Sequence, residues 1–131
     1  MKKFIFILFI LAVIICYFLF FKNNPCSNKK AKIYQINKKN YCLLTASNQE
    51  QWEKGLMFYK KPVDFDGMIF IFPDKQYRTF WNKNTYLNLD IYWMENNVIA
   101  GKSFLPSILK SKEIFTVKSS NKVNRVVEII F

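Results

Sequence analysis

The feature that most limits what this chain can fold into is an unbroken apolar run near its start. Residues 4–21, FIFILFILAVIICYFLFF, are eighteen apolar or aromatic residues between Lys3 and Lys22. A helix of this length is near the lower limit for crossing a hydrocarbon core, whereas the apolar core of a cleavable signal is usually shorter. The following KNNPCSNKK offers no small-x-small cleavage site. We therefore predict a retained membrane helix within residues 1–22, with a cleaved signal as the alternative.

The basic residues on either side of this run bear on its orientation. Lys2 and Lys3 form a short basic head before an apolar run, which is the usual form of an export signal. The positive-inside rule also counts the lysines after the run, and these oppose export: Lys22, Lys29, Lys30 and Lys32. We expect the body to lie on the extracytoplasmic side, attached to the membrane through residues 4–21.

The rest of the chain has room for a linker and one domain. Residues 23–32 are polar, contain a proline and lack periodicity, which is typical of a juxtamembrane linker. Within residues 33–131 the apolar pattern predicts about eight short strands, near 33–36, 41–45, 67–72, 79–81, 89–94, 98–104, 114–117 and 123–130.

One short helix is predicted over about residues 48–55. Ser47 and Glu50 have the spacing of a capping box, and Gly55 is a stop signal. Many short strands and one helix indicate a mainly β (α+β) fold, either a small β-barrel or a sandwich-like domain.

The three cysteines divide by location. Cys16 lies inside the apolar run, so Cys26 and Cys42 are left for the body. Export would allow these two to form a disulfide, with two free thiols as the alternative.

The charge and composition exclude several functions. The net charge is +11, but of the twenty basic residues only Arg78 and Arg125 are arginine, and no dense basic run with interleaved aromatics occurs. We therefore expect no nucleic-acid partner. The absence of histidine removes Ser-His-Asp and Cys-His catalysis and most catalytic zinc sites, and we predict no metal and no cofactor.

Three blocks of sequence match a known pattern. GLMFYKK (55–61), DFDGMIFIFPD (64–74) and FWNKNTYLNLDI (80–91), in this order, resemble the family called domain of unknown function 192. The resemblance spans roughly residues 42–130. It implies a compact β-rich fold with a small helical part, commonly exported behind an N-terminal signal, and it implies no established activity or cofactor.

The chain departs from the pattern of that family at three places. Tyr59 stands where the family usually has arginine, and Asn82 replaces the methionine of FWMKNT. After Glu128 the family usually continues through a glycine-containing loop and a further strand, whereas this sequence stops at Phe131. We expect this stop to leave an open sheet edge.

The stretch from residue 80 to residue 90 holds the best candidate site. Its candidate ligand-binding residues are Trp81, Lys83, Asn84, Thr85 and Asp90. A stacking surface, several donors and one carboxylate are the mixture expected where a small polar ligand binds. The same residues have a structural alternative, in which Asp90 holds the loop by accepting hydrogen bonds from backbone amides, Thr85 and Lys83.

The sequence thus favours a membrane-anchored module of unknown function that binds a small polar ligand or a protein partner. The alternative is an enzyme of unknown substrate in which Asp90 is a general base and Lys83 stabilises negative charge.

Overall fold

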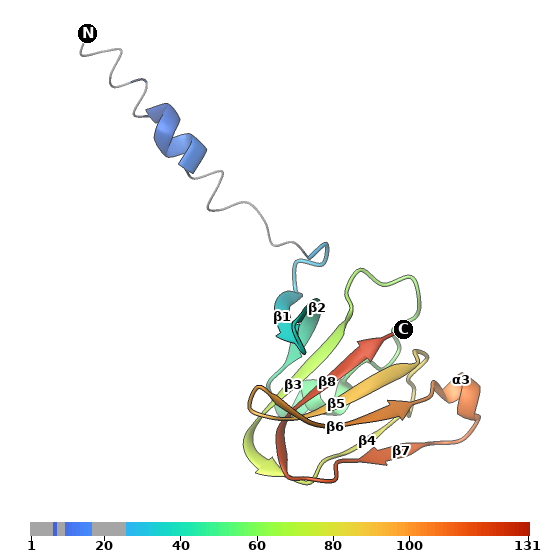
Figure 1. The fold of residues 1–131 in the computed structure, drawn as a ribbon. Helices are drawn as coiled ribbons and strands as arrows, with labels where there is room; N and C mark the ends of the chain where they lie inside the picture. Colours follow the sequence, from blue (N-terminus) through green and yellow to red (C-terminus); the bar gives the residue numbers. More distant parts are fainter. Residues whose placement is uncertain (1–6, 8–9, 17–25) are drawn as a thin grey trace.

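The computed structural model describes residues 7, 10–16 and 26–131 (Figure 1). Residues 10–16 are helical, and no helix among the described residues is long and apolar enough to cross a membrane. Most of the predicted anchor at residues 4–21, and part of the predicted linker, lie outside the described residues. The anchor therefore stays a prediction.

The domain is mainly β, as predicted, and its eight strands match the predicted runs closely. The strands are β1 (Lys32–Ile36), β2 (Lys39–Ala46), β3 (Gly67–Gln76), β4 (Thr79–Trp81), β5 (Leu89–Glu95), β6 (Val98–Leu105), β7 (Thr116–Lys118) and β8 (Val123–Ile130). Two short helices accompany them, α2 (Gln49–Lys54) and α3 (Ile108–Ser111).

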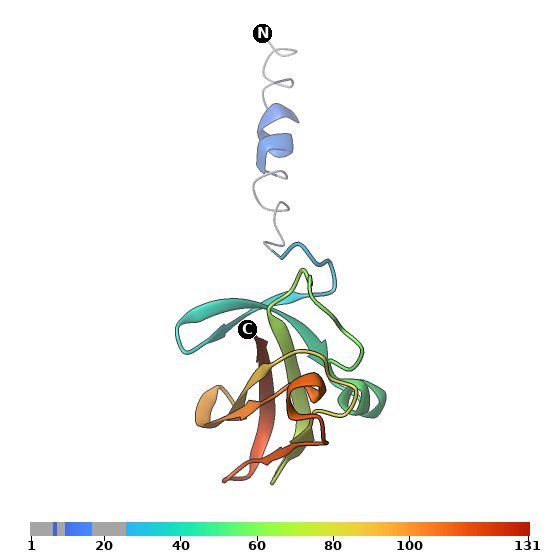
Figure 2. The ribbon, with the colours of Figure 1, turned by 90° about the vertical axis from the view of Figure 1, so that its right-hand side faces the viewer.

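Six strands form one sheet in the order β1-β2-β3-β8-β5-β6, while β4 and β7 form a separate pair. All pairings are antiparallel except that of β2 with β3, which are connected through α2. The large sheet curls into a half-barrel (Figures 1 and 2). Its edges are β1 and β6, whereas the C-terminal strand β8 is central. The sheet therefore has open edges at β1 and β6, and neither edge is the C-terminal strand.

The half-barrel also corrects the prediction of a barrel or sandwich. The strands of the large sheet do not close, and the small β4–β7 pair covers part of the inner face instead. Phe80 of β4 packs edge-on against Phe70 of β3, with ring centroids 4.8 Å apart, and its ring lies 5.7 Å from that of Trp93. These aromatic contacts fill the space that a closing strand would otherwise occupy.

Side chains on the two faces of the sheet form two apolar clusters. The inner core contains Leu44, Phe70, Leu89, Ile91, Trp93 and Val126. The outer cluster contains Ile36, Leu43, Ile69, Met94, Val127 and Ile129. Because successive strand residues point to opposite faces, the continuous apolar run of β3 is buried on both faces, as predicted.

Local chemistry explains two differences from the predicted elements. The cap of α2 is Asn48, whose side chain accepts from the Gln51 amide at 3.0 Å, while the Gln51 side chain accepts from the Ser47 amide. The reciprocal cap is therefore shifted by one residue from the predicted Ser47–Glu50 pair, and Gly55 ends the helix as predicted, at a φ of 48°.

The second difference is the helix α3, a single turn between β6 and β7 that the sequence did not predict. Ser107 caps it by accepting from the Lys110 amide at 3.2 Å. A helix of only four residues has no apolar periodicity to reveal it.

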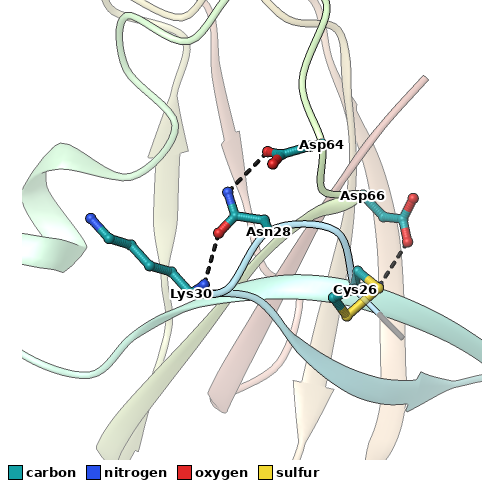
Figure 3. The surroundings of a disulfide bond; sticks show 6 residues. Cys26, Asn28, Lys30, Asp64 and Asp66 are labelled. Atoms are coloured by element: carbon teal, nitrogen blue, oxygen red, sulfur yellow. Dashed lines mark hydrogen bonds between the residues drawn. A yellow bond between two sulfur atoms is a disulfide. The ribbon is translucent and has the colours of Figure 1, made fainter. Parts of the chain in front are cut away.

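Cys26 and Cys42 form a disulfide that ties the start of the domain to β2 (Figure 3). Their Cα atoms lie 5.5 Å apart. Asp66 accepts from the Cys42 amide at 2.7 Å, and Asp64 accepts from the Asn28 side chain at 2.9 Å. Residues 26–31 are thus fixed against the loop that enters β3.

Candidate functional site

The connection from β4 to β5 is held by the buried amide of Asn82. Its Nδ2 donates to the Pro106 carbonyl and to Ser111 Oγ, both at 2.8 Å, and its Oδ1 accepts from the Phe115 amide at 2.7 Å. The methionine that the family usually has here could make none of these bonds. Asn82 therefore couples the connection to α3 and to the start of β7.

Asp90 does not have the predicted loop-holding role. Its carboxylate accepts from Lys102 Nζ on β6 at 2.8 Å, and the hydrogen bond to Asp90 raises the pKa of Lys102. Leu89 and Ile91 both belong to the inner core, so Asp90 between them points to the outer face of the sheet. The Thr85 hydroxyl donates instead to the Lys83 carbonyl at 3.2 Å.

Two of the predicted site residues, Trp81 and Thr85, line a narrow cleft of about 30 Å³ over the inner face. The GLMF block and the FWNKNT block meet there, although they are separated in sequence. The lining residues are Trp52, Glu53, Lys54, Gly55, Leu56, Met57, Phe70, Phe80, Trp81, Thr85 and Glu128. Six of the eleven lining residues are thus aromatic or apolar, the accessible surface of the cleft is mainly polar, and Glu128 adds a carboxyl group from the central strand.

That carboxyl group belongs to Glu128, which is only 4% exposed. Glu128 is opposite Met68 on β3 and Ile91 on β5. Neither of these side chains can donate a hydrogen bond to its carboxyl group. Its Oε2 is buried and has no hydrogen-bond partner among the described residues. Burial without compensation raises the pKa of Glu128 to about 8, which leaves the empty cleft with a mainly neutral carboxyl at pH 7.

Two glycines allow close contacts near the cleft, one between β3 and β8 and one against the Phe70 ring. A Cβ on Gly67 would lie 1.8 Å from the Glu128 carbonyl oxygen, so β3 can lie this close to β8 only without a side chain there. Gly55, which lines the cleft, has a φ of 48°, and a Cβ on it would lie 3.2 Å from the Phe70 ring. Both glycines belong to the blocks that resemble the family pattern.

Sequence reasoning missed Glu128 as a site residue because it treated Asp90 as the single acid among apolar strand residues. Glu128 stands in VVEII, between apolar residues of the predicted strand 123–130. The alternation of β8 places it on the face of Val126 and Ile130, which pack in or against the inner core. The alternation of side chains along the predicted strand was therefore the sequence feature from which Glu128 could have been identified.

Lys83 and Asn84 lie beside the cleft and do not line it. Lys83 is exposed, with Nζ 5.2 Å from the centroid of the Trp81 ring. Asn84 has a φ of 52°, and its carbonyl accepts from the Phe58 amide at 2.9 Å. This bond joins the FWNKNT turn to the GLMF block. Whether Lys83 and Asn84 contact a ligand stays a prediction.

Arg78 Nε is the other buried side-chain atom without a hydrogen-bond partner among the described residues, but its guanidinium pairs with Asp74 and lies over the Phe72 ring. No cluster of three or more Asp, Glu, Cys or His side chains suited to a metal ion occurs in the described part of the chain. Tyr59, in place of the arginine usual in the family, packs edge-on against Phe65 with ring centroids 5.1 Å apart. Its role in this chain is packing.

The fold and the cleft define a class of small mainly β domain, in which an open curled sheet carries a buried acid beneath an aromatic wall. The sequence pattern of the family described as Uncharacterized ACR, domain of unknown function 192 (DUF192), matches residues 32–130. The chain belongs to this family. No curated protein matches the sequence.

Two solved structures are similar to the chain. One is a protein from Sinorhizobium meliloti 1021, provisionally described as a transcription regulator, with 26% identity over 75% of this chain and 76% of that chain and a TM-score of 0.58. The other is a protein of unknown function from Novosphingobium aromaticivorans DSM 12444, with 19% identity, coverage of 83% and 86%, and a TM-score of 0.54. The second likeness concerns the fold alone.

Proposed function

We propose that the domain is a small-ligand-binding module, exported and attached to the membrane through residues 4–21, whose ligand enters the cleft beside Trp81. One observation carries this proposal: Glu128 Oε2 is buried without a hydrogen-bond partner among the described residues. Leaving a buried polar atom unpaired costs roughly 1–3 kcal/mol. A ligand group that hydrogen-bonds to this oxygen removes that cost. The recovered free energy contributes to the affinity of the cleft for such a ligand.

The walls of the cleft support a binding role. Ligand sites typically combine apolar and aromatic residues with a few placed polar groups, and six of the eleven residues that line this cleft are aromatic or apolar. The Trp81 side chain is 47% exposed at the mouth, so one large aromatic surface is accessible from solvent.

The size of the cleft limits what it holds. A volume of about 30 Å³ accommodates one small head group. Lys54 and Gly55 also line a wider hollow of about 390 Å³ beside it, which offers room for the remainder of a ligand.

The proposed site differs in part from the site predicted from the sequence. It keeps Trp81 and Thr85 and adds Glu128, while Lys83 and Asn84 are placed at its border. Asp90 is left out, because its carboxylate pairs with Lys102 on the outer face. The same pair gives no support to the alternative in which Asp90 and Lys83 act together as an enzyme.

The disulfide supports the proposed location. Disulfides persist in oxidising compartments and are rare in the cytosol, so the Cys26–Cys42 bond favours a body on the extracytoplasmic side. The apolar run at residues 4–21 supports attachment to the membrane.

Screening the full-length protein with a chemically mixed fragment set tests the proposed function. We expect fragments that shift the NMR signals of the Trp52 and Trp81 indoles and bind about tenfold more weakly to Glu128→Gln, because a neutral amide replaces the ionisable carboxyl with which they pair. Asp90→Asn, on the opposite face, is the matched control and should bind as the wild type does. Fragments that bind elsewhere only, or bind Glu128→Gln unchanged, would refute the proposal.

A further inference from the structure

We infer that the cleft receives a primary ammonium group, so that its ligands are small amines bound through Glu128 with their alkyl part along Trp81. This inference depends on the proposed function and names the chemical class of its ligand. It is based on three properties of the cleft: the charge of its acceptor, the nature of its walls and its size.

The polar groups of the cleft select for a cation that donates hydrogen bonds. The Glu128 carboxyl is mainly protonated at pH 7, and once ionised it only accepts hydrogen bonds, so the ionised form repels anions and pairs with a cationic donor. Thr85 is the other buried polar side chain in the lining, and its hydroxyl already donates to the Lys83 carbonyl. A neutral polyol would need several polar partners, and an apolar ligand would leave Glu128 Oε2 unpaired.

The walls favour the same choice. Phe70, Phe80 and Trp81 supply aromatic rings to the lining, and the face of such a ring attracts a cation, as does the Trp81 ring with the Lys83 ammonium 5.2 Å from its centroid. The small volume admits an ammonium head with its three protons, whereas a quaternary ammonium is bulkier and has no proton to donate.

Binding an amine requires the ionised form of Glu128. In the empty cleft burial raises the pKa of this carboxyl, so an entering ammonium ion displaces the carboxyl proton to solvent. The products are the ammonium–carboxylate pair and one released proton, and charge is conserved. The other titratable groups that line the cleft are Glu53 and Lys54 on α2, and the Lys83 ammonium lies beside it, 5.2 Å from the centroid of the Trp81 ring.

The linked proton gives the inference a distinctive signature. Below the pKa of Glu128, amine affinity should rise about tenfold for each pH unit and then level off above it. Fixed surface charges such as those of Glu53 and Lys54 change the affinity without producing this slope. Lys54 is itself an ammonium at the rim, so Lys54→Met should leave amine binding equal or stronger.

The experiment titrates full-length protein with n-butylammonium chloride at pH 6, 7 and 8, following the indole NMR signals of Trp52 and Trp81. We expect binding that tightens with pH, and binding about tenfold or more weaker in Glu128→Gln. At matched concentrations, n-butanol and tetramethylammonium chloride should each bind at least about tenfold more weakly than butylammonium. n-Butanol lacks the positive charge, and tetramethylammonium lacks N–H donors.

The outcomes separate the two proposals. If n-butanol binds as well as butylammonium, or if butylammonium affinity does not change with pH, the ammonium inference is wrong. If other fragments occupy the cleft while butylammonium does not, the inference fails and the proposed function stands. If no compound shifts the cleft signals, both fail. The wild-type comparisons remain decisive even where Glu128→Gln folds poorly.

Discussion

Glu128 is the residue at which stability and the proposed binding role oppose each other. An apolar residue in its place would pack against Met68 and Ile91 without the cost of an unpaired carboxyl oxygen. A site that gives up stability in this way is typical of binding and catalytic positions. The cost is lowest when the carboxyl is protonated, which makes the stability of the domain depend on pH.

We therefore predict that unfolding free energy falls as pH rises through neutrality. The ordinary pKa of a glutamate is 4.5, and burial raises that of Glu128 to about 8. Between these values the folded protein keeps a proton that the unfolded chain loses, so stability decreases by up to about 1.4 kcal/mol per pH unit. The loss should end above pH 8.

Urea denaturation of the full-length protein, followed by tryptophan fluorescence at several pH values, measures this effect. The glutamine side chain of Glu128→Gln does not titrate between pH 5 and pH 8. The unfolding free energy of this variant should therefore not show the additional fall with pH that we predict for the wild type. Parallel curves for the two proteins between pH 5 and pH 8 would show that Glu128 titrates normally.

At the scale of elements, the connection between β4 and β5 depends on one buried amide. Asn82 satisfies three groups that belong to Pro106, Ser111 and Phe115. We predict that Asn82→Ala destabilises the protein by about 1–3 kcal/mol, because buried donors and acceptors lose their partner.

Asp90→Ala is the matched comparison for this prediction. It removes a solvent-exposed ion pair with Lys102, so it should destabilise the protein less than Asn82→Ala does. Chemical denaturation of both variants measures the two losses of unfolding free energy and shows which residue holds the connection. A larger loss for Asp90→Ala than for Asn82→Ala would return the loop-holding role to Asp90.

The strands could be predicted from the sequence because each has a local pattern. β3 and β8 have apolar runs, and the turn between β5 and β6 has polar residues. The predicted end of β3 at Pro73 was wrong, since the strand continues to Gln76. The register with β8 is irregular between Ile71 and Gln76, and proline is tolerated where the ladder is broken.

The site was less predictable because it depends on which strands become neighbours. Trp81 and Thr85 could be found from a local block of sequence. The role of Glu128 follows from the position of β8 between β3 and β5, and the role of Asn82 from contacts with residues 24 to 33 positions away. Neither the strand neighbours of Glu128 nor the contacts of Asn82 can be recognised from a short stretch of sequence.

At the scale of the whole molecule, the disulfide determines how the start of the domain is attached. β1 is an edge strand that pairs only with β2 in the described structure, and residues 26–31 precede it. The Cys26–Cys42 bond closes a segment of 16 positions and fixes it beside Asp64 and Asp66 (Figure 3). Without it, this end of the sheet would have only one neighbouring strand to hold it.

We predict that Cys42→Ser lowers the unfolding free energy by about 2–4 kcal/mol, the range expected when a closed loop of this length is opened in the unfolded chain. Cys16→Ser leaves the bond intact and is the matched control, which should unfold as the wild type does. A reducing agent should destabilise the wild type and Cys16→Ser to the same degree and leave Cys42→Ser unchanged. Equal stability of wild type and Cys42→Ser under oxidising conditions would mean that the hydrogen bonds of Asn28 and Cys42 hold this end without the covalent tie.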